Sequence, residues 1–135
     1  MTGIEHRVLS IRLEGAARPV PLLAAFTYRC ERPYELTLDF EGGGRHIARW
    51  VFSRDLLLDG ESRTTGEGDI RVWPGRRGSE PRVCLAFSGG GRSCVVSARA
   101  KDVRALCRRL VELVPRGEEP RHYDLDAEVS GLLSR

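Results

Sequence analysis

The acidic side chains that could supply general acid and base chemistry gather in one short stretch of the chain. They are Asp55, Asp59, Glu67 and Asp69. Two carboxylates can exchange protons or hold a cation if folding brings them together. A simpler explanation fits most of them, because Asp55 falls in the first turn of a predicted helix and Asp69 in a turn before a predicted strand. We therefore expect these acids to have structural roles.

The histidines and cysteines do not show the spacing of a metal site. His6, His46 and His122 are far apart in the sequence, and the cysteines form no Cys-x-x-Cys pair. Each cysteine lies in an apolar stretch and is expected to be a small buried side chain; the four are Cys30, Cys84, Cys94 and Cys107. We expect no metal and no cofactor.

The glycine clusters raise the possibility of a phosphate-binding loop. Gly66-Glu67-Gly68-Asp69 departs from the Gly-x-Gly-x-x-Gly pattern and would place two acids beside a phosphate. The clusters 42–44 and 89–91 lack the lysine of a P-loop and fall where antiparallel strands need turns. No serine lies in a Gly-x-Ser-x-Gly motif. We therefore expect no catalytic residue.

One segment combines an aromatic side chain with positive charge. Trp73 and Pro74 precede Gly75-Arg76-Arg77-Gly78, which we expect to form a loop. Such a group suits a protein partner, or single-stranded nucleic acid through base stacking. Trp73 fits a core position equally well. The candidate partner-binding residues are therefore Trp73, Arg76 and Arg77.

The composition describes one folded domain spanning residues 1–135, with 41% hydrophobic and 30% charged residues. The net charge is +3, and Lys101 is the only lysine among 22 basic residues. Acids and arginines interleave, whereas nucleic-acid-binding domains concentrate their positive charge, so nucleic acid is an unlikely partner. The N-terminus does not read as a signal peptide, and no apolar run is long enough to span a membrane. We therefore expect a cytoplasmic protein.

Alternating apolar residues predict about seven strands. The runs are 6–14, 24–30, 34–41 and 45–52, then shorter ones around 70–72, 83–87 and 95–96. The first four should form an antiparallel meander. The expected fold class is α+β, with two antiparallel sheets and C-terminal helices.

Three helices are predicted. Ser53 should cap a short helix over 54–59 that Gly60 closes. Apolar residues at helical spacing predict a long amphipathic helix over 101–114. A second apolar stripe, after a capping residue at Asp124, predicts a helix that starts there.

Five segments of the sequence, in the same order, resemble the SsgA-like proteins of sporulating actinomycetes. The segments are Pro33-Tyr34, Trp50–Leu57 with Gly60, Thr65–Pro74, Val114–Glu118, and Asp124–Asp126 ahead of Leu132-Leu133. The similarity extends over nearly the whole chain. The resemblance implies a Whirly-like fold, assembly as a homotrimer, and no enzymatic activity. It also implies control of septum formation at division septa, through the tubulin-like division protein FtsZ or another SsgA-like protein.

Three functions remain open from the sequence: a division-protein adaptor, a Whirly-like module for single-stranded nucleic acid, and an enzyme of unrecognised type. The adaptor is favoured by the resemblance. The sequence adds a reason to expect self-association, because segments 22–26 and 50–52 are apolar on both faces and need cover on both sides.

Overall fold

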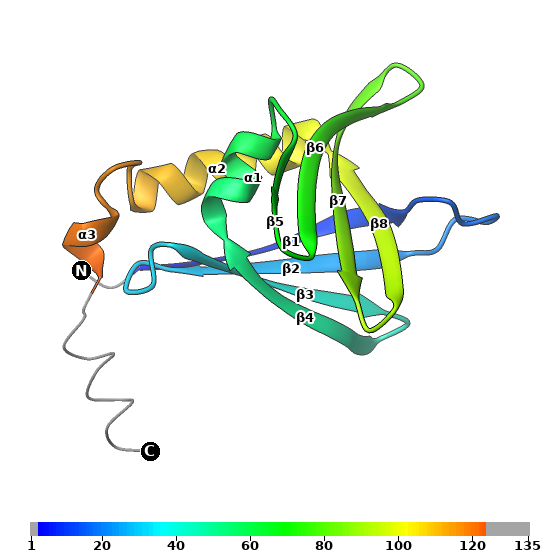
Figure 1. Ribbon diagram of the computed structural model, residues 1–135, viewed down its shortest axis with the longest axis horizontal. Helices are drawn as coiled ribbons and strands as arrows, with labels where there is room; N and C mark the ends of the chain where they lie inside the picture. The colour runs from blue at the N-terminus through cyan, green and yellow to red at the C-terminus, as the bar shows by residue number, and fades with distance from the viewer. Residues whose placement is uncertain (1–2, 124–135) are drawn as a thin grey trace.

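The structure is a computed structural model in which residues 3–123 are described. Its elements, in chain order, are β1 (Ile4–Leu13), β2 (Leu22–Arg29), β3 (Glu35–Gly42), β4 (Arg45–Ser53), α1 (Arg54–Gly60), β5 (Thr65–Glu67), β6 (Ile70–Arg77), β7 (Glu80–Gly89), β8 (Arg92–Arg99), α2 (Ala100–Leu113) and α3 (Glu119–His122). Figure 1 shows β1–β4 as one layer, with β5–β8 rising steeply across it and α1 and α2 side by side above it. The expected α+β class is confirmed.

The strands form one continuous antiparallel sheet in the order β4-β3-β2-β1-β8-β7-β6-β5. Within the described residues, its two four-stranded halves are joined by strand pairing of Arg12 with Ser97 and of Leu13 with Val96. The expectation of two sheets with seven strands was therefore wrong in both respects. The additional strand is β5, which lies outside the runs of alternating residues that predicted strands. It forms because the buried Thr65 hydroxyl donates to the Leu56 carbonyl at 2.8 Å while Thr65 pairs with Val72.

The core lies inside the curl of this sheet. Its aromatic centre is Phe87, which is in contact with Phe40, Trp50 and Phe52 at ring distances of 5.2, 5.1 and 6.4 Å. The predicted alternation in the meander is confirmed, since Leu36, Leu38 and Phe40 are all buried. The predicted glycine turns are also present, with positive φ at residues 43, 44, 90 and 91.

The helices follow the sequence pattern closely. Ser53 Oγ accepts from the Asp55 N–H at 3.3 Å and caps α1, whose three leucines are buried. Helix α2 begins one residue before the predicted start and ends one residue before the predicted end. The short helix α3 was not expected, and the helix predicted from Asp124 lies outside the described residues.

Two further expectations need correction. The segment 75–77 continues strand β6, and the turn is confined to the residues after Arg77. Pro74 permits this because β5 pairs β6 only as far as Val72, so Pro74 lies on an edge where its missing N–H costs nothing. Of the cysteines, Cys30 and Cys107 are buried as expected, Cys84 is half-buried and Cys94 is exposed. Cys94 lies near the β7–β8 turn, at the start of β8 where the strand is exposed.

Candidate partner-binding site

A row of side chains crosses the outer face of the sheet, the face that points away from the core. Trp73 pairs with Cys84, Cys84 with Ser97, and Ser97 with Arg12. Directly paired residues share one face of a sheet. The row therefore places Trp73 of β6 and Arg12 of β1 on the same surface, with two strands between them.

A polar network lies beside this row and is centred on Arg82, which is buried despite its charge. Its Nε donates to Ser97 Oγ and its Nη2 to the Ser97 carbonyl, both at 2.8 Å, while Nη1 donates to Glu80 at 2.7 Å. The Ser97 hydroxyl in turn donates to Glu14. The hydrogen bond from Arg82 holds the pKa of Glu80 below its ordinary value, so Glu80 stays ionised at neutral pH.

The network forms one wall of a crevice of about 630 Å³, which we name the Arg12 crevice. Its lining residues are Val8, Leu9, Ser10, Ile11, Arg12, Arg77, Glu80, Arg82, Arg99 and Asp102. Four arginines against two carboxylates leave an excess of two positive charges. The crevice therefore attracts anionic groups.

Two of these arginines have no partner among the described residues. The side chain of Arg77 is exposed and takes part in no hydrogen bond or ion pair within residues 3–123. Arg12 Nε is buried and lacks a hydrogen-bond acceptor in the same part of the chain. Arg82 and Arg99, in contrast, both lie beside Glu80, at 2.7 and 3.9 Å. The unused capacity of the crevice to donate hydrogen bonds lies in Arg12 and Arg77.

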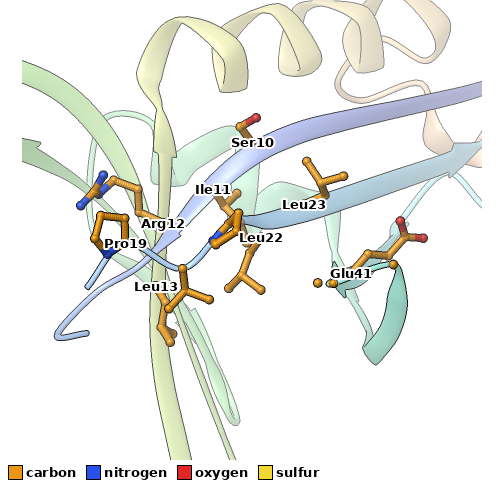
Figure 2. Close-up of a pocket in the computed structure, with 13 residues that line it drawn as sticks. Ser10, Ile11, Arg12, Leu13, Pro19, Leu22, Leu23 and Glu41 are labelled. Carbon is orange, nitrogen blue, oxygen red and sulfur yellow. The ribbon is translucent and has the colours of Figure 1, made fainter. Parts of the chain in front are cut away.

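A second, more apolar hollow of about 740 Å³ adjoins the first and shares Ser10, Ile11 and Arg12 with it. Figure 2 shows Arg12 beside Pro19 at one end of the hollow, with Leu22 and Leu23 along it and Glu41 at the other end. Leu23 is 43% exposed. A partner that reached Arg12 would therefore meet apolar surface on one side and arginines on the other.

The three partner-binding candidates predicted from the sequence do not all lie on one face of the sheet. Trp73 is half-buried, with Arg71 over its ring at 5.6 Å, and shares the outer face with Arg77. Arg76 lies on the opposite face, because successive strand residues alternate. Arg12, Arg82 and Arg99 were missed. They alternate with apolar residues, which marks an outward face, but only the pairing register brings them beside Arg77.

Several of the remaining chemically capable side chains have structural partners. Asp59 pairs with Arg63 at 3.1 Å and with Arg116 at 2.9 Å, and His46 contacts Asp39 at 2.8 Å. No group of three or more metal-ligating side chains occurs within residues 3–123. Burial raises the pKa of the Cys84 thiol, and Glu14 raises it further, which disfavours the reactive thiolate. No helix in the described part of the chain is long and apolar enough to cross a membrane.

Comparison with known proteins gives a consistent result over most of the chain. A family model described as "Streptomyces sporulation and cell division protein, SsgA" matches residues 22–119. The sporulation-specific cell division protein SsgB of Streptomyces coelicolor is 38% identical over 85% of this chain and 84% of its own length. SsgB of Thermobifida fusca is also 38% identical, over 86% of this chain and 84% of its own.

Solved structures agree with the sequence matches. An SsgA-like sporulation-specific cell division protein from Thermobifida fusca superimposes with a TM-score of 0.86 at 34% identity, covering 96% of both chains. An SsgB structure from work on sporulation of Streptomyces coelicolor gives a TM-score of 0.83 at 34% identity, covering 91% of this chain and 98% of that one. The chain belongs to the SsgA family of sporulation and cell division proteins.

Proposed function

We propose that this protein is a non-enzymatic regulator of sporulation-specific cell division that acts as an adaptor for FtsZ or another SsgA-like protein. The observation that carries the proposal is the family membership: the relatives named above are sporulation-specific cell division proteins and match over more than four fifths of the chain. The Arg12 crevice and the adjoining apolar hollow offer a surface for a protein partner.

The proposal includes assembly as a homotrimer of Whirly-like subunits in the cytoplasm at division septa. Exposed apolar side chains on the outer side of the β1–β4 layer support self-association. Val8 is 49% exposed and Leu23 43% exposed, on neighbouring strands. Covering such residues with a second copy removes apolar surface from water. A closed symmetric assembly would also present each partner site several times and raise avidity for a polymeric division protein.

The proposal is tested in a sporulating host that lacks the gene. A fluorescent fusion should restore septation and form regular ladders at the division sites, and light scattering of the purified protein should give the mass of a trimer. Co-precipitation with FtsZ or another SsgA-like protein should identify the partner. A diffuse fusion that leaves septation unrestored would contradict the role in division. A strict monomer at tens of micromolar that captures neither protein would contradict the adaptor.

A module for single-stranded nucleic acid is the second candidate, favoured by the position of Trp73 on the same face as four arginines. Binding to phosphates is strongly salt-dependent, because counterions are released. Sub-micromolar affinity for single-stranded DNA at physiological salt, lost on substituting Arg77, would favour this function over the adaptor. We expect weak binding that disappears as salt is raised.

A further inference from the structure

We propose that the Arg12 crevice binds an extended acidic segment of a protein partner, with Arg12 and Arg77 receiving its carboxylates. The inference rests on the proposed adaptor function and specifies which surface and which partner chemistry serve it. Three features support it: an open strand edge, unpaired arginines, and the acids that line the crevice.

The open edge belongs to β1. On one side, residues 4–11 of β1 pair continuously with β2. On the other side, β8 pairs only with Arg12 and Leu13; the pairing stops there although β8 continues to Arg99, after which the chain enters α2. Residues 8–11 therefore line the crevice without a strand partner on that side among the described elements. An extended polypeptide can pair with such an edge through its backbone.

The arginines specify the charge of that polypeptide. A buried donor without an acceptor costs free energy, and Arg12 Nε is such a donor. Arg12 is only half-buried and its Nη atoms are not fully buried, so a carboxylate from outside can reach them and bind the guanidinium through two parallel hydrogen bonds. Arg77 provides a second, exposed cation at the far wall, so a segment with spaced acidic residues matches both positions.

The lining also argues against a nucleic-acid strand as the occupant. Glu80 and Asp102 lie among the four arginines and would repel a continuous phosphate backbone. The backbone groups at the β1 edge complement a peptide strand, whereas nucleic acid has no matching row of amides. A protein segment with separate carboxylates fits these constraints.

The experiment uses the full-length protein and a fluorescein-labelled synthetic peptide that alternates valine and glutamate. Fluorescence anisotropy should detect binding that weakens with salt, and a valine–glutamine peptide should bind at least about tenfold more weakly, as expected for loss of charge-assisted hydrogen bonds. Arg77→Gln should weaken binding of the acidic peptide by about tenfold. Arg76→Gln is the matched control, because Arg76 is exposed on the same strand but on the opposite face, and it should leave binding nearly unchanged.

Arg12→Met provides an independent readout. It removes the unpaired donor and keeps an aliphatic side chain, so it should abolish peptide binding while leaving the melting temperature unchanged or higher. Equal affinities for the two peptides, equal losses in Arg76→Gln and Arg77→Gln, or binding only of a single-stranded oligonucleotide would each overturn the proposal. Loss of binding in Arg12→Met with a matching loss of stability would do the same.

Failure of the proposed function looks different. If the acidic peptide binds as described but deleting the gene leaves septation intact, the crevice inference stands and the division role fails. If septation requires the protein while Arg77→Gln and Arg12→Met both complement the deletion fully and peptide binding is absent, the division role stands and the crevice inference fails.

Discussion

Arg54 Nη2 donates a hydrogen bond of 2.9 Å to Glu119 Oε1, and this ion pair joins the start of α1 to α3. Arg54 is only 1% exposed, so the pair lies in the interior. Its Nη1 donates to the Leu110 carbonyl at 3.2 Å, and its guanidinium lies 5.4 Å from the centre of the Tyr28 ring. Burial raises the pKa of Tyr28 to about 12, although the Arg54 charge acts in the opposite direction. One arginine thus connects three helices and β2.

Removing Glu119 should destabilise the protein strongly. Glu119→Ala leaves the buried Arg54 charge without its counter-ion, which typically costs about 3–5 kcal/mol in the free energy of unfolding. Replacing both residues with methionine should cost less than Glu119→Ala alone, because no charge is then buried unpaired. Urea unfolding measures each free energy. Glu118→Ala is the control, since Glu118 pairs with the exposed Arg121, and it should change stability by less than about 0.5 kcal/mol. Equal stabilities of Glu119→Ala and Glu118→Ala would refute this role.

The Arg54–Glu119 pair should also weaken in acid. Burial raises the pKa of Glu119, but hydrogen bonds from its own backbone N–H, from Arg54 and from Gly117, with the Arg54 charge, outweigh it and lower the pKa overall. A carboxyl whose folded pKa is lowered stabilises the protein above its unfolded pKa of about 4.3, and this contribution disappears as pH falls through the folded value. The stability difference between wild type and Glu119→Gln should therefore shrink below about pH 4. A difference that stays constant from pH 7 to about pH 3 would contradict this linkage.

The sequence predicts features that depend on neighbouring residues. The cap at Ser53, the glycine turns and the alternation of Leu36, Leu38 and Phe40 are local, and all are present. Strand β5 was missed because three residues are too few to show a period, and its formation depends on the contact between Thr65 and Leu56. A charged residue at the start of a helix is normally exposed, and Arg54 is buried because partners distant in sequence, Glu119 above all, receive its guanidinium.

The sequence predicted only part of the candidate site, because the rest depends on contacts between residues that are distant in the sequence. Arg76 and Arg77 are adjacent in the sequence, and the expectation of a loop placed them together with Trp73. The strand separates them, since Arg76 and Arg77 point to opposite faces. Arg12 reaches the same surface only because β1 pairs with β8 at Ser97. This register depends on how the two halves of the sheet meet, and no local pattern encodes it.

The close approach of α1 to β6 predicts the effect of a single methyl group at Gly60. A Cβ there would overlap Val72 Cγ1 and lie 2.7 Å from Val72 Cβ. Gly60→Ala should cost about 1–3 kcal/mol of stability, because overpacking shifts the helix away from the sheet. Val72→Ala removes Cγ1, the nearer of the two clashing atoms, so the double variant should lose less stability than the sum of the two single variants. Strictly additive losses in urea unfolding would show that α1 accommodates the methyl group without contacting Val72.

The aromatic residues around Phe87 should differ in their contributions to stability. Trp50 and Phe52 lie on one face of β4, where Phe52 is buried and Trp50 is half-buried at an apolar cavity of about 550 Å³. Phe87→Ala and Phe52→Ala should each cost about 3–5 kcal/mol. Trp50→Ala should cost less, about 1–3 kcal/mol, since part of its ring already contacts water in the folded state.

Chemical denaturation of the three variants at constant pH tests this order, and the exposed Val51→Ala, on the opposite face of β4, is the control with a small expected loss. A Trp50→Ala variant as unstable as Phe87→Ala would mean that another copy of the chain covers Trp50 in solution. The loss would then depend on protein concentration, because dissociation and unfolding are coupled in an oligomer. Measuring the denaturation midpoint at two protein concentrations therefore shows whether Trp50 is buried within one subunit or between subunits.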